Sequence, residues 1–248
     1  MNHTVVGLAV ALACAPGITT RLAESATPAP GRQQNMWNWT GRIAPGKALE
    51  IRGVNGRIEA EFSSRNEVVV TATKRAHHSD PDEVKIEVVQ HEGSVTICAV
   101  YPGSSNRCGT DDAYHMSTHN NDVEVEFHAQ VPAGVAFRGG TVNGDVEVAN
   151  LAGPVNAETV NGSVAAVLHG QGTTPLSFKT VNGGVTVSVP KDLNADLEAE
   201  TVNGSIETDF PITVTGRINR RHLDGRIGQG GRHLKIETVN GSIRLRAL

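Results

Sequence analysis

Alternating apolar and polar positions run through much of the chain and recur around a repeated Val-Asn-Gly sequence. The asparagine of this sequence stands at positions 55, 143, 161, 182, 203 and 240, and a degenerate copy, Leu223-Asp224-Gly225, precedes the last. Counting that copy, the steps from position 143 onward are 18, 21, 21, 21 and 16 residues. Such regular spacing predicts an architecture built from repeats.

Two apolar columns flank every copy. Six positions before the asparagine, or the aspartate of the degenerate copy, stand Leu49, Phe137, Val155, Leu176, Leu197, Ile218 and Leu234. Three positions after it stand Ile58, Val146, Val164, Val185, Ile206, Ile227 and Ile243. Alternate side chains of a strand share a face, so each copy predicts two half-buried strands joined by a tight turn, where Asn-Gly supplies a positive φ. The predicted turn residues are Asn55, Gly56, Asn143, Gly144, Asn161, Gly162, Asn182, Gly183, Asn203, Gly204, Asp224, Gly225, Asn240 and Gly241.

Charge helps to choose between two ways of arranging these strands. From the third copy onward, the column three positions before the asparagine, or the aspartate of the degenerate copy, holds Glu158, Lys179, Glu200, Arg221 and Glu237, with alternating sign. In a β-solenoid, equivalent residues of neighbouring coils lie ~4.8 Å apart, where like charges repel. In an antiparallel meander they lie two strands apart and need not alternate. The column therefore favours a solenoid with coils stacked in chain order, in which the asparagine amides could also hydrogen-bond along a ladder.

The fold class predicted from these patterns is all-β. Residues 36–135 hold only the first Val-Asn-Gly copy, but strands are expected at 67–73, 84–89, 94–100 and 123–127, and no amphipathic helix is evident. We expect a β-hairpin-rich region over 36–135 and a β-solenoid of about 21-residue coils over 136–248. An antiparallel β-meander or sandwich remains the alternative.

The N-terminus resembles an export signal. An apolar run of eleven residues, Val5 to Ala15, carries no charge, which fits a signal peptide and is too short to span a bilayer. We expect a signal peptide over residues 1–25, where several cleavage sites fit, a linker over 26–35, and no transmembrane helix afterwards. A buried N-terminal strand is one alternative. A lipid anchor at Cys14 is another, although Ala11-Leu12-Ala13 matches a lipobox poorly.

Cysteine use and composition agree with an exported, non-nucleic-acid-binding protein. After leader removal, Cys98 and Cys108 remain, and an even pair in an exported chain predicts a disulfide. The formal net charge of −4 offers no basic field for nucleic acid. Aromatic residues make up only 4% of the chain, which predicts a thin core of Val, Leu and Ile without a roomy aromatic pocket.

Three groups of residues are candidates for a metal site or a catalytic site. The polar loop 102–122 holds Asp111, Asp112, His115, His119 and Asp122, but the i, i+4 histidines would need a helix to share a metal. His77 and His78, before Asp80-Pro81-Asp82, are typical of an exposed turn. Paired carboxylates of a polysaccharide-cleaving β-helix could come from Glu158, Glu200, Glu207 and Asp209, which share an outward face with basic neighbours. Solvated surface is the simpler interpretation of all three, so no enzyme, metal or cofactor is expected.

The arranged repeats resemble a bacterial family of exported β-strand-repeat proteins described as candidate adhesins of unknown function. The resemblance spans residues 36–248. It rests on Val54-Asn55-Gly56-Arg57-Ile58, the strand Glu67–Thr73 and Val131-Pro132-Ala133-Gly134, followed by Thr-Val-Asn-Gly beginning at Thr141, Thr159, Thr180, Thr201 and Thr238. It implies a β-solenoid in the cell envelope and brings no catalytic residues.

The resulting functional hypothesis is a non-catalytic β-solenoid in the periplasm or at the cell surface. Its regular surface would contact an envelope or extracellular protein or polysaccharide. Two alternatives are a polysaccharide-acting enzyme on a β-helix and an envelope-stress regulatory or sensory protein. The second reflects the occurrence of members of the resembled family near envelope-stress regulatory systems.

Overall fold

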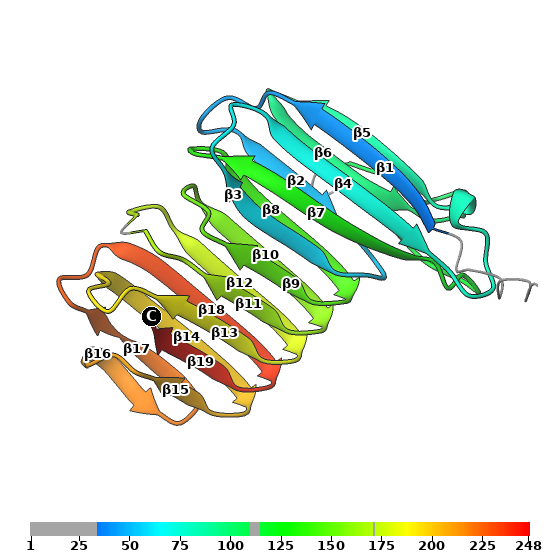
Figure 1. Ribbon diagram of the computed structural model, residues 1–248. Helices are drawn as coiled ribbons and strands as arrows, with labels where there is room; N and C mark the ends of the chain where they lie inside the picture. The colour runs from blue at the N-terminus through cyan, green and yellow to red at the C-terminus, as the bar shows by residue number, and fades with distance from the viewer. Residues whose placement is uncertain (1–33, 110–114, 171) are drawn as a thin grey trace, which may run out of the picture. The chain divides into compact units, whose positions relative to one another are not determined.

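The computed structural model describes residues 34–109, 115–170 and 172–248, all within one compact unit, Arg32–Leu248 (Figure 1). The side chains of residues 34 and 215–218 are not described. The expected signal peptide, the linker up to residue 33 and Cys14 lie outside the described residues, as do Asp111 and Asp112. Among the described residues no helix is long and apolar enough to cross a bilayer.

The strands form two mixed sheets, and the all-β prediction is confirmed. Sheet A has the order β1 (Gln34–Gly41), β4 (Val68–Arg75), β7 (Glu124–Pro132), β3 (Ile58–Ser63), β9 (Val146–Ala149), β11 (Val164–Val167), β13 (Val185–Val189), β19 (Ile243–Ala247) and β15 (Ile206–Thr208). Sheet B has the order β16 (Ile212–Asn219), β17 (His222–Ile227), β14 (Ala195–Asn203), β18 (Arg232–Asn240), β12 (Leu176–Asn182), β10 (Val155–Asn161), β8 (Ala136–Asn143), β2 (Ala48–Arg52), β6 (Ser94–Val100) and β5 (Lys85–His91). A short 3-10 helix, η1 (Pro81–Glu83), precedes β5.

Each Val-Asn-Gly corner joins one strand of sheet B to one strand of sheet A, and we call such a pair of strands a coil. The coils are β2–β3, β8–β9, β10–β11, β12–β13, β14–β15 and β18–β19. Neighbouring coils pair in parallel and in register, so that Asn161 lies opposite Asn182 and Val164 opposite Val185. This parallel pairing contradicts an antiparallel meander for the repeats, in which neighbouring strands would run in opposite directions.

The coils do not stack in chain order, which corrects the prediction made from the charge column. The C-terminal coil β18–β19 lies between β12–β13 and β14–β15, as Figure 1 shows for the red strands. In sheet B, β18 pairs with β12 on one side and β14 on the other. In sheet A, β19 likewise pairs with both β13 and β15.

The degenerate copy is not a corner, so the predicted turn at Asp224-Gly225 is wrong. Both residues lie inside β17, which pairs antiparallel with β14 and with β16. An aspartate has no amide N–H₂ with which to continue an asparagine ladder. His222 also occupies the position that a threonine occupies in the five later complete copies. Without these two groups the segment folds back as the hairpin β16–β17.

Two ladders of side-chain hydrogen bonds follow the corners. Five asparagine amides each donate to the asparagine of the preceding coil in the stack at 2.7–2.9 Å, in the unbroken order Asn55, Asn143, Asn161, Asn182, Asn240 and Asn203, where Asn55 is the terminal acceptor. In the five later complete copies, the threonine two positions before the asparagine donates to a corner-glycine carbonyl of the neighbouring coil. Thr159 reaches the carbonyl of Gly144 and Thr180 that of Gly162, both at 2.8 Å. These bonds fix the spacing and register of the coils.

The corner glycines are required mainly by close approach. Gly56 does have a left-handed φ of 121°. At Gly162, Gly183, Gly204 and Gly241, however, φ lies outside the left-handed region, and an added Cβ would stand only 1.8–2.1 Å from a carbonyl oxygen of the next corner. The expectation that positive φ explains every Asn-Gly is therefore wrong for these four corners.

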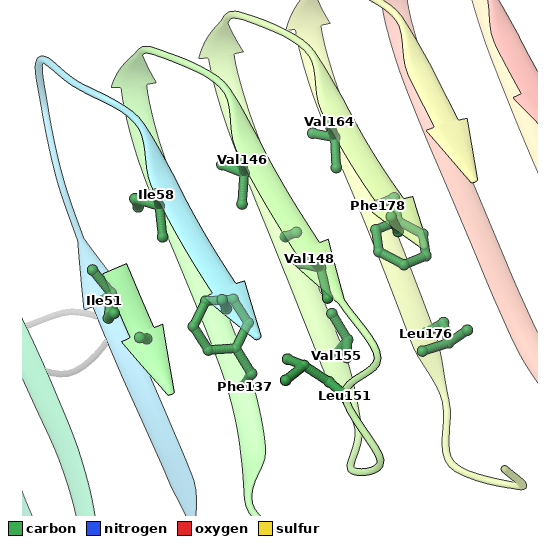
Figure 2. Close-up of a cluster of buried hydrophobic side chains, with 14 of the residues drawn as sticks. Ile51, Ile58, Phe137, Val146, Val148, Leu151, Val155, Val164, Leu176 and Phe178 are labelled. Atoms are coloured by element: carbon green, nitrogen blue, oxygen red, sulfur yellow. The ribbon is translucent and has the colours of Figure 1, made fainter. Parts of the chain in front are cut away.

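The core lies between the two sheets and consists mostly of Val, Leu and Ile, as the composition predicts. Figure 2 shows Ile58, Val146 and Val164 in one row on sheet A, and Phe137 and Phe178 on sheet B. Both phenylalanines are fully buried. The large rings fit because small side chains lie beside them: Gly139 and Ala157 occupy the neighbouring inward positions on β8 and β10.

The N-terminal strands extend the same two sheets. β3 pairs with β7 as well as β9, and β2 pairs with β6 as well as β8. Four of these strands, β4, β5, β6 and β7, fall where the alternation predicts them. Both sheets therefore continue without a break across residue 135.

Candidate binding surface on sheet B

The outer face of sheet B carries three columns of side chains that point away from the core. The column five positions before the asparagines holds, in spatial order, Glu50, Arg138, Asn156, Ser177, Lys235 and Glu198. The column three positions before holds Arg52, Gly140, Glu158, Lys179, Glu237 and Glu200. The column directly before the asparagines holds only valine along five consecutive strands.

These valines form an exposed apolar line, which we call the valine stripe: Val142, Val160, Val181, Val239 and Val202. All but Val181, which is half-buried, are 36–50% exposed. Parallel pairing places successive members one strand spacing, ~4.8 Å, apart. The stripe is thus a contiguous apolar surface, whereas isolated exposed apolar residues are common and need no explanation.

A groove of about 880 Å³ lies beside the stripe, over β2, β8, β10, β12 and β18. Gly140 accounts for part of the hollow because it has no side chain where its strand neighbours carry Arg52 and Glu158. Val142, Val160 and Val181 line one side. The groove therefore combines an apolar wall with a polar floor, as ligand sites commonly do.

Fixed ion pairs stand at both ends of the groove. At one end the nearly buried Glu50 accepts hydrogen bonds from Arg52 Nε at 2.7 Å and from Thr96 Oγ1 at 3.1 Å. At the other end Lys235 Nζ lies 3.1 Å from Glu237 and 3.4 Å from Glu198. The hydrogen bond and charge of Glu237, followed by those of Glu198, raise the pKa of Lys235. These groups hold each other in place and give the groove rigid ends.

Two exposed charges at the centre of the groove have no ion-pair partner among the described residues. Arg138 and Glu158 flank Gly140, and Glu158 leans so far over it that an added Cβ would meet its carboxylate at 3.5 Å. Because neither charge is neutralised within the described chain, both can bind polar groups of a ligand.

The predicted charge ladder has a different order in space. Glu158 lies opposite Lys179, but the next neighbour of Lys179 is Glu237, at 3.8 Å between Nζ and Oε2. Glu200 follows and faces Glu237, so two like charges are adjacent. Arg221 precedes β17, where its carbonyl accepts from the Thr201 amide at 2.8 Å. Because β18 lies between β12 and β14, charges that alternate in chain order do not alternate along the sheet.

Reversing the charge at Lys179 is expected to destabilise the stack. Lys179→Glu places a third carboxylate between Glu158 and Glu237, so the free energy of unfolding should fall by a few tenths to about 1 kcal/mol at low salt. Urea unfolding at low and high ionic strength measures the effect, which salt should reduce. An unchanged midpoint at low salt would show that the column contributes nothing.

Cys98 and Cys108 form a disulfide that closes a ten-residue separation, with the two Cα atoms 5.6 Å apart. Cys98 is fully buried on β6. The disulfide holds the start of the loop that follows β6. Tyr101 anchors the same segment, because its hydroxyl donates to the carbonyl of Val123 at 2.7 Å.

Removing the disulfide by Cys98→Ser with Cys108→Ser is expected to lower the free energy of unfolding by about 2–3 kcal/mol, because the open loop gives the unfolded chain more freedom. Denaturant unfolding of the oxidised wild type and the double variant gives the difference. The two thiols of the wild type should also resist labelling until a reductant is added. Equal stability of the two proteins, with labelling of both thiols before reduction, would contradict this role.

Among the candidate metal and catalytic residues that the structure describes, the side chains are not brought together into a site. His115 pairs with Arg107 through backbone hydrogen bonds. Asp122 accepts hydrogen bonds from the backbone amides of Ser79 and His78, and these bonds, above all that of Ser79, lower the pKa of Asp122. No group of three or more metal-ligating side chains occurs in the ranges that the structure describes. The four carboxylates divide between the sheets. Glu158 and Glu200 lie on sheet B with β12 and β18 between them, whereas Glu207 and Asp209 bind Arg246 beside sheet A.

The repeat arrangement can now be compared with known proteins. Residues 140–246 match the family model Toastrack DUF4097. The Toastrack match runs from β8 to β19 and leaves out the β2–β3 coil, although this coil stacks in register on β8–β9. A search of curated proteins found no match.

One solved structure shares the fold beyond the Toastrack match, and two others align more weakly. A "putative cell adhesion protein" from Clostridium sporogenes aligns with a TM-score of 0.59 and 15% identity over 86% of this chain and 100% of that chain. A "putative adhesin" from Bacteroides fragilis has a TM-score of 0.31 and 10% identity over 85% and 97% of the two chains. A "putative lipid binding protein" from Parabacteroides distasonis has a TM-score of 0.28 and 13% identity over 85% and 96%. The likeness to the Clostridium sporogenes protein concerns the fold alone.

Sequence reasoning missed the groove and the valine stripe, both of which lie largely within the Toastrack match. The signals were present: valine precedes the asparagine in every complete copy, and glycine occurs only once, at Gly140, in the column three positions before it.

Proposed function

We propose that this protein is a non-catalytic, exported β-solenoid whose groove and valine stripe bind an envelope or extracellular partner, a protein or a polysaccharide. The observation that carries the proposal is the valine stripe. It places a valine on each of five neighbouring strands, four of them exposed and Val181 half-buried, directly beside a groove in which Arg138 and Glu158 have no ion-pair partner among the described residues. A contiguous apolar line on the outer face of a sheet is typical of an interaction surface.

Rigidity favours binding by this surface. The asparagine and threonine ladders fix every coil relative to the next, so little conformational entropy is lost when a partner binds. Side chains repeat at ~4.8 Å, which suits an extended partner that makes the same contact several times. Arg138 and Glu158 would provide the polar contacts that orient it.

A triple variant tests the proposal without changing the strands. Val142→Thr, Val160→Thr and Val181→Thr keep the β-branched shape and replace methyl groups by hydroxyls. Val167→Thr is the matched control, because Val167 is similarly exposed but lies on sheet A. The probes are intact bacterial cells, purified envelope polysaccharide and immobilised extracellular matrix proteins.

We expect wild type and Val167→Thr to bind the same probe and the triple variant to lose at least tenfold in affinity, about 1.4 kcal/mol. Equal binding by all three proteins would place the contact elsewhere and contradict the proposal. Release of oligosaccharides from the polysaccharide probe would contradict the non-catalytic part.

A further inference from the structure

The position of the C-terminal coil makes it separable from the rest of the stack. β18–β19 is the last coil in the chain, yet it contacts β12–β13 on one side and β14–β15 on the other. Its removal breaks four strand pairings and leaves the pairings among the first four coils intact. The remaining slot has two parallel walls, each with one free edge in each sheet.

The walls of this slot have the same register. Leu176 and Leu197 both lie opposite Leu234, and Asn182 and Asn203 both lie opposite Asn240. The slot therefore accepts one coil with the Val-Asn-Gly spacing in a single register. Chemically identical slots exist in every copy of the chain, so the C-terminal coil of a second copy fits as well as the chain's own.

A short hinge connects the C-terminal coil to the hairpin. Residues 228–231 link β17 to β18, and the three glycines among them, Gly228, Gly230 and Gly231, have φ values of 56°, 75° and 112°. These left-handed values fold the chain back into its own slot. Extension of the hinge would carry the coil away from the slot at little steric cost, because glycine adopts both conformations.

The inserted arrangement also brings two carboxylates together. Glu237 of the C-terminal coil faces Glu200 of β14, and the lysines that offset the repulsion are Lys235 and Lys179, whose Nζ atoms lie 3.1 Å and 3.8 Å from Glu237. Without the inserted coil, the same registers would let β14 meet β12 directly, with Glu200 opposite Lys179. When the C-terminal coil is outside, the walls of the slot can therefore close with Glu200 in the place of Glu237 beside Lys179, which offsets part of the cost of release.

We propose that a second copy of this chain is a partner, and that two copies exchange residues 232–248 reciprocally, each C-terminal coil filling the slot of the other. The exchange reuses every contact of the monomer and adds none but those near the hinge, as in domain-swapped dimers. The exchange involves the coils beyond β12–β13, and it does not depend on which ligand the groove binds.

Two tagged copies of the full chain test the exchange, both in a Cys14→Ser background so that no other unpaired cysteine is present. One copy carries Lys179→Cys and the other Glu237→Cys, two positions that lie opposite each other on β12 and β18. The copies are co-expressed with different tags and oxidised mildly. Gel filtration and non-reducing electrophoresis then separate monomers from covalent heterodimers, and mass spectrometry identifies the linked residues.

The matched control uses one copy with Glu158→Cys and one with Lys179→Cys. These residues are also opposite each other on adjacent strands, but they belong to consecutive coils in the interior of the chain. Random collisions link both pairs equally, whereas exchange of the C-terminal coil links only the first.

We expect a heterodimer of twice the monomer mass, joined through positions 179 and 237, in clear excess over the control pair. Equal yields for the two pairs would overturn the proposal. The same conclusion would follow if the protein eluted only as a monomer at every concentration.

Discussion

Phe178→Ala is expected to lower the free energy of unfolding by about 3–5 kcal/mol, the usual cost of emptying a phenylalanine site in a packed core. Phe178 is fully buried on β12, between Ala157 and Ile236 of the neighbouring strands (Figure 2). The ladders on either side fix the strand spacing, so the cavity can collapse only if corner hydrogen bonds are strained. The effect should therefore lie towards the upper end of this range. Denaturant unfolding provides the measurement.

Phe62→Ala is the control for this variant. Phe62 lies at the end of β3 and is 43% exposed, so its truncation should cost much less than that of Phe178. Similar losses in both variants would mean that burial between the sheets does not determine stability here.

Gly183→Ala is expected to cost about 3 kcal/mol or more, because the added methyl group collides with backbone that cannot move. Its Cβ would stand 1.9 Å from the carbonyl oxygen of Gly162 and 2.6 Å from the carbonyl carbon. Relief requires the two coils to separate at the corner, and this breaks the bond between the Asn182 and Asn161 amides. Thermal unfolding of the variant should show a large drop in midpoint.

Gly170→Ala separates this steric effect from the general effect of losing a glycine. A Cβ at Gly170 would meet nothing within 4 Å, and the residue is exposed. We expect its stability to stay within about 0.5 kcal/mol of wild type. If Gly183→Ala were equally harmless, the corners could not be as close as the structure shows them.

The repeat pattern was sufficient to predict local structure. Alternation around Asn143, Asn161 and Asn182 predicts two strands per copy, and these strands are present with the expected faces buried. The threonine and asparagine of each copy act through neighbours along the stack. In the sequence, only the repetition indicates this role, because each copy taken alone predicts simply a turn.

The spatial order of the coils could not be predicted from the sequence. Every complete copy presents the same apolar columns and the same corner, so β18–β19 fits beside β12–β13 as well as β14–β15 does. The order of the coils depends on the hairpin β16–β17, which occupies the far edge of β14 and reverses the direction of the chain. Because such similar repeats do not specify which copy lies beside which, charge alternation in chain order predicts the wrong neighbour for Lys179.

The candidate binding surface was missed for a related reason. A valine before each asparagine is ordinary for a strand, since β-branched residues fit pleated sheets. Parallel stacking turns separate valines into a line, and the absence of a side chain at Gly140 helps to open the groove beside it. Both features arise between coils, so no single copy contains them.

The most direct test of the account is the order of the coils, which creates both the charge order and the continuous stripe. Two double variants of one chain suffice, each in a Cys14→Ser background and oxidised mildly as a dilute monomer. Lys179→Cys with Glu237→Cys places the thiols on adjacent strands, about 4.8 Å apart, a Cα separation that a disulfide can span. Lys179→Cys with Glu200→Cys places them two strands apart, beyond that reach. We predict an intramolecular disulfide in the first variant and free thiols in the second; a disulfide between positions 179 and 200, with free thiols at 179 and 237, would contradict the account.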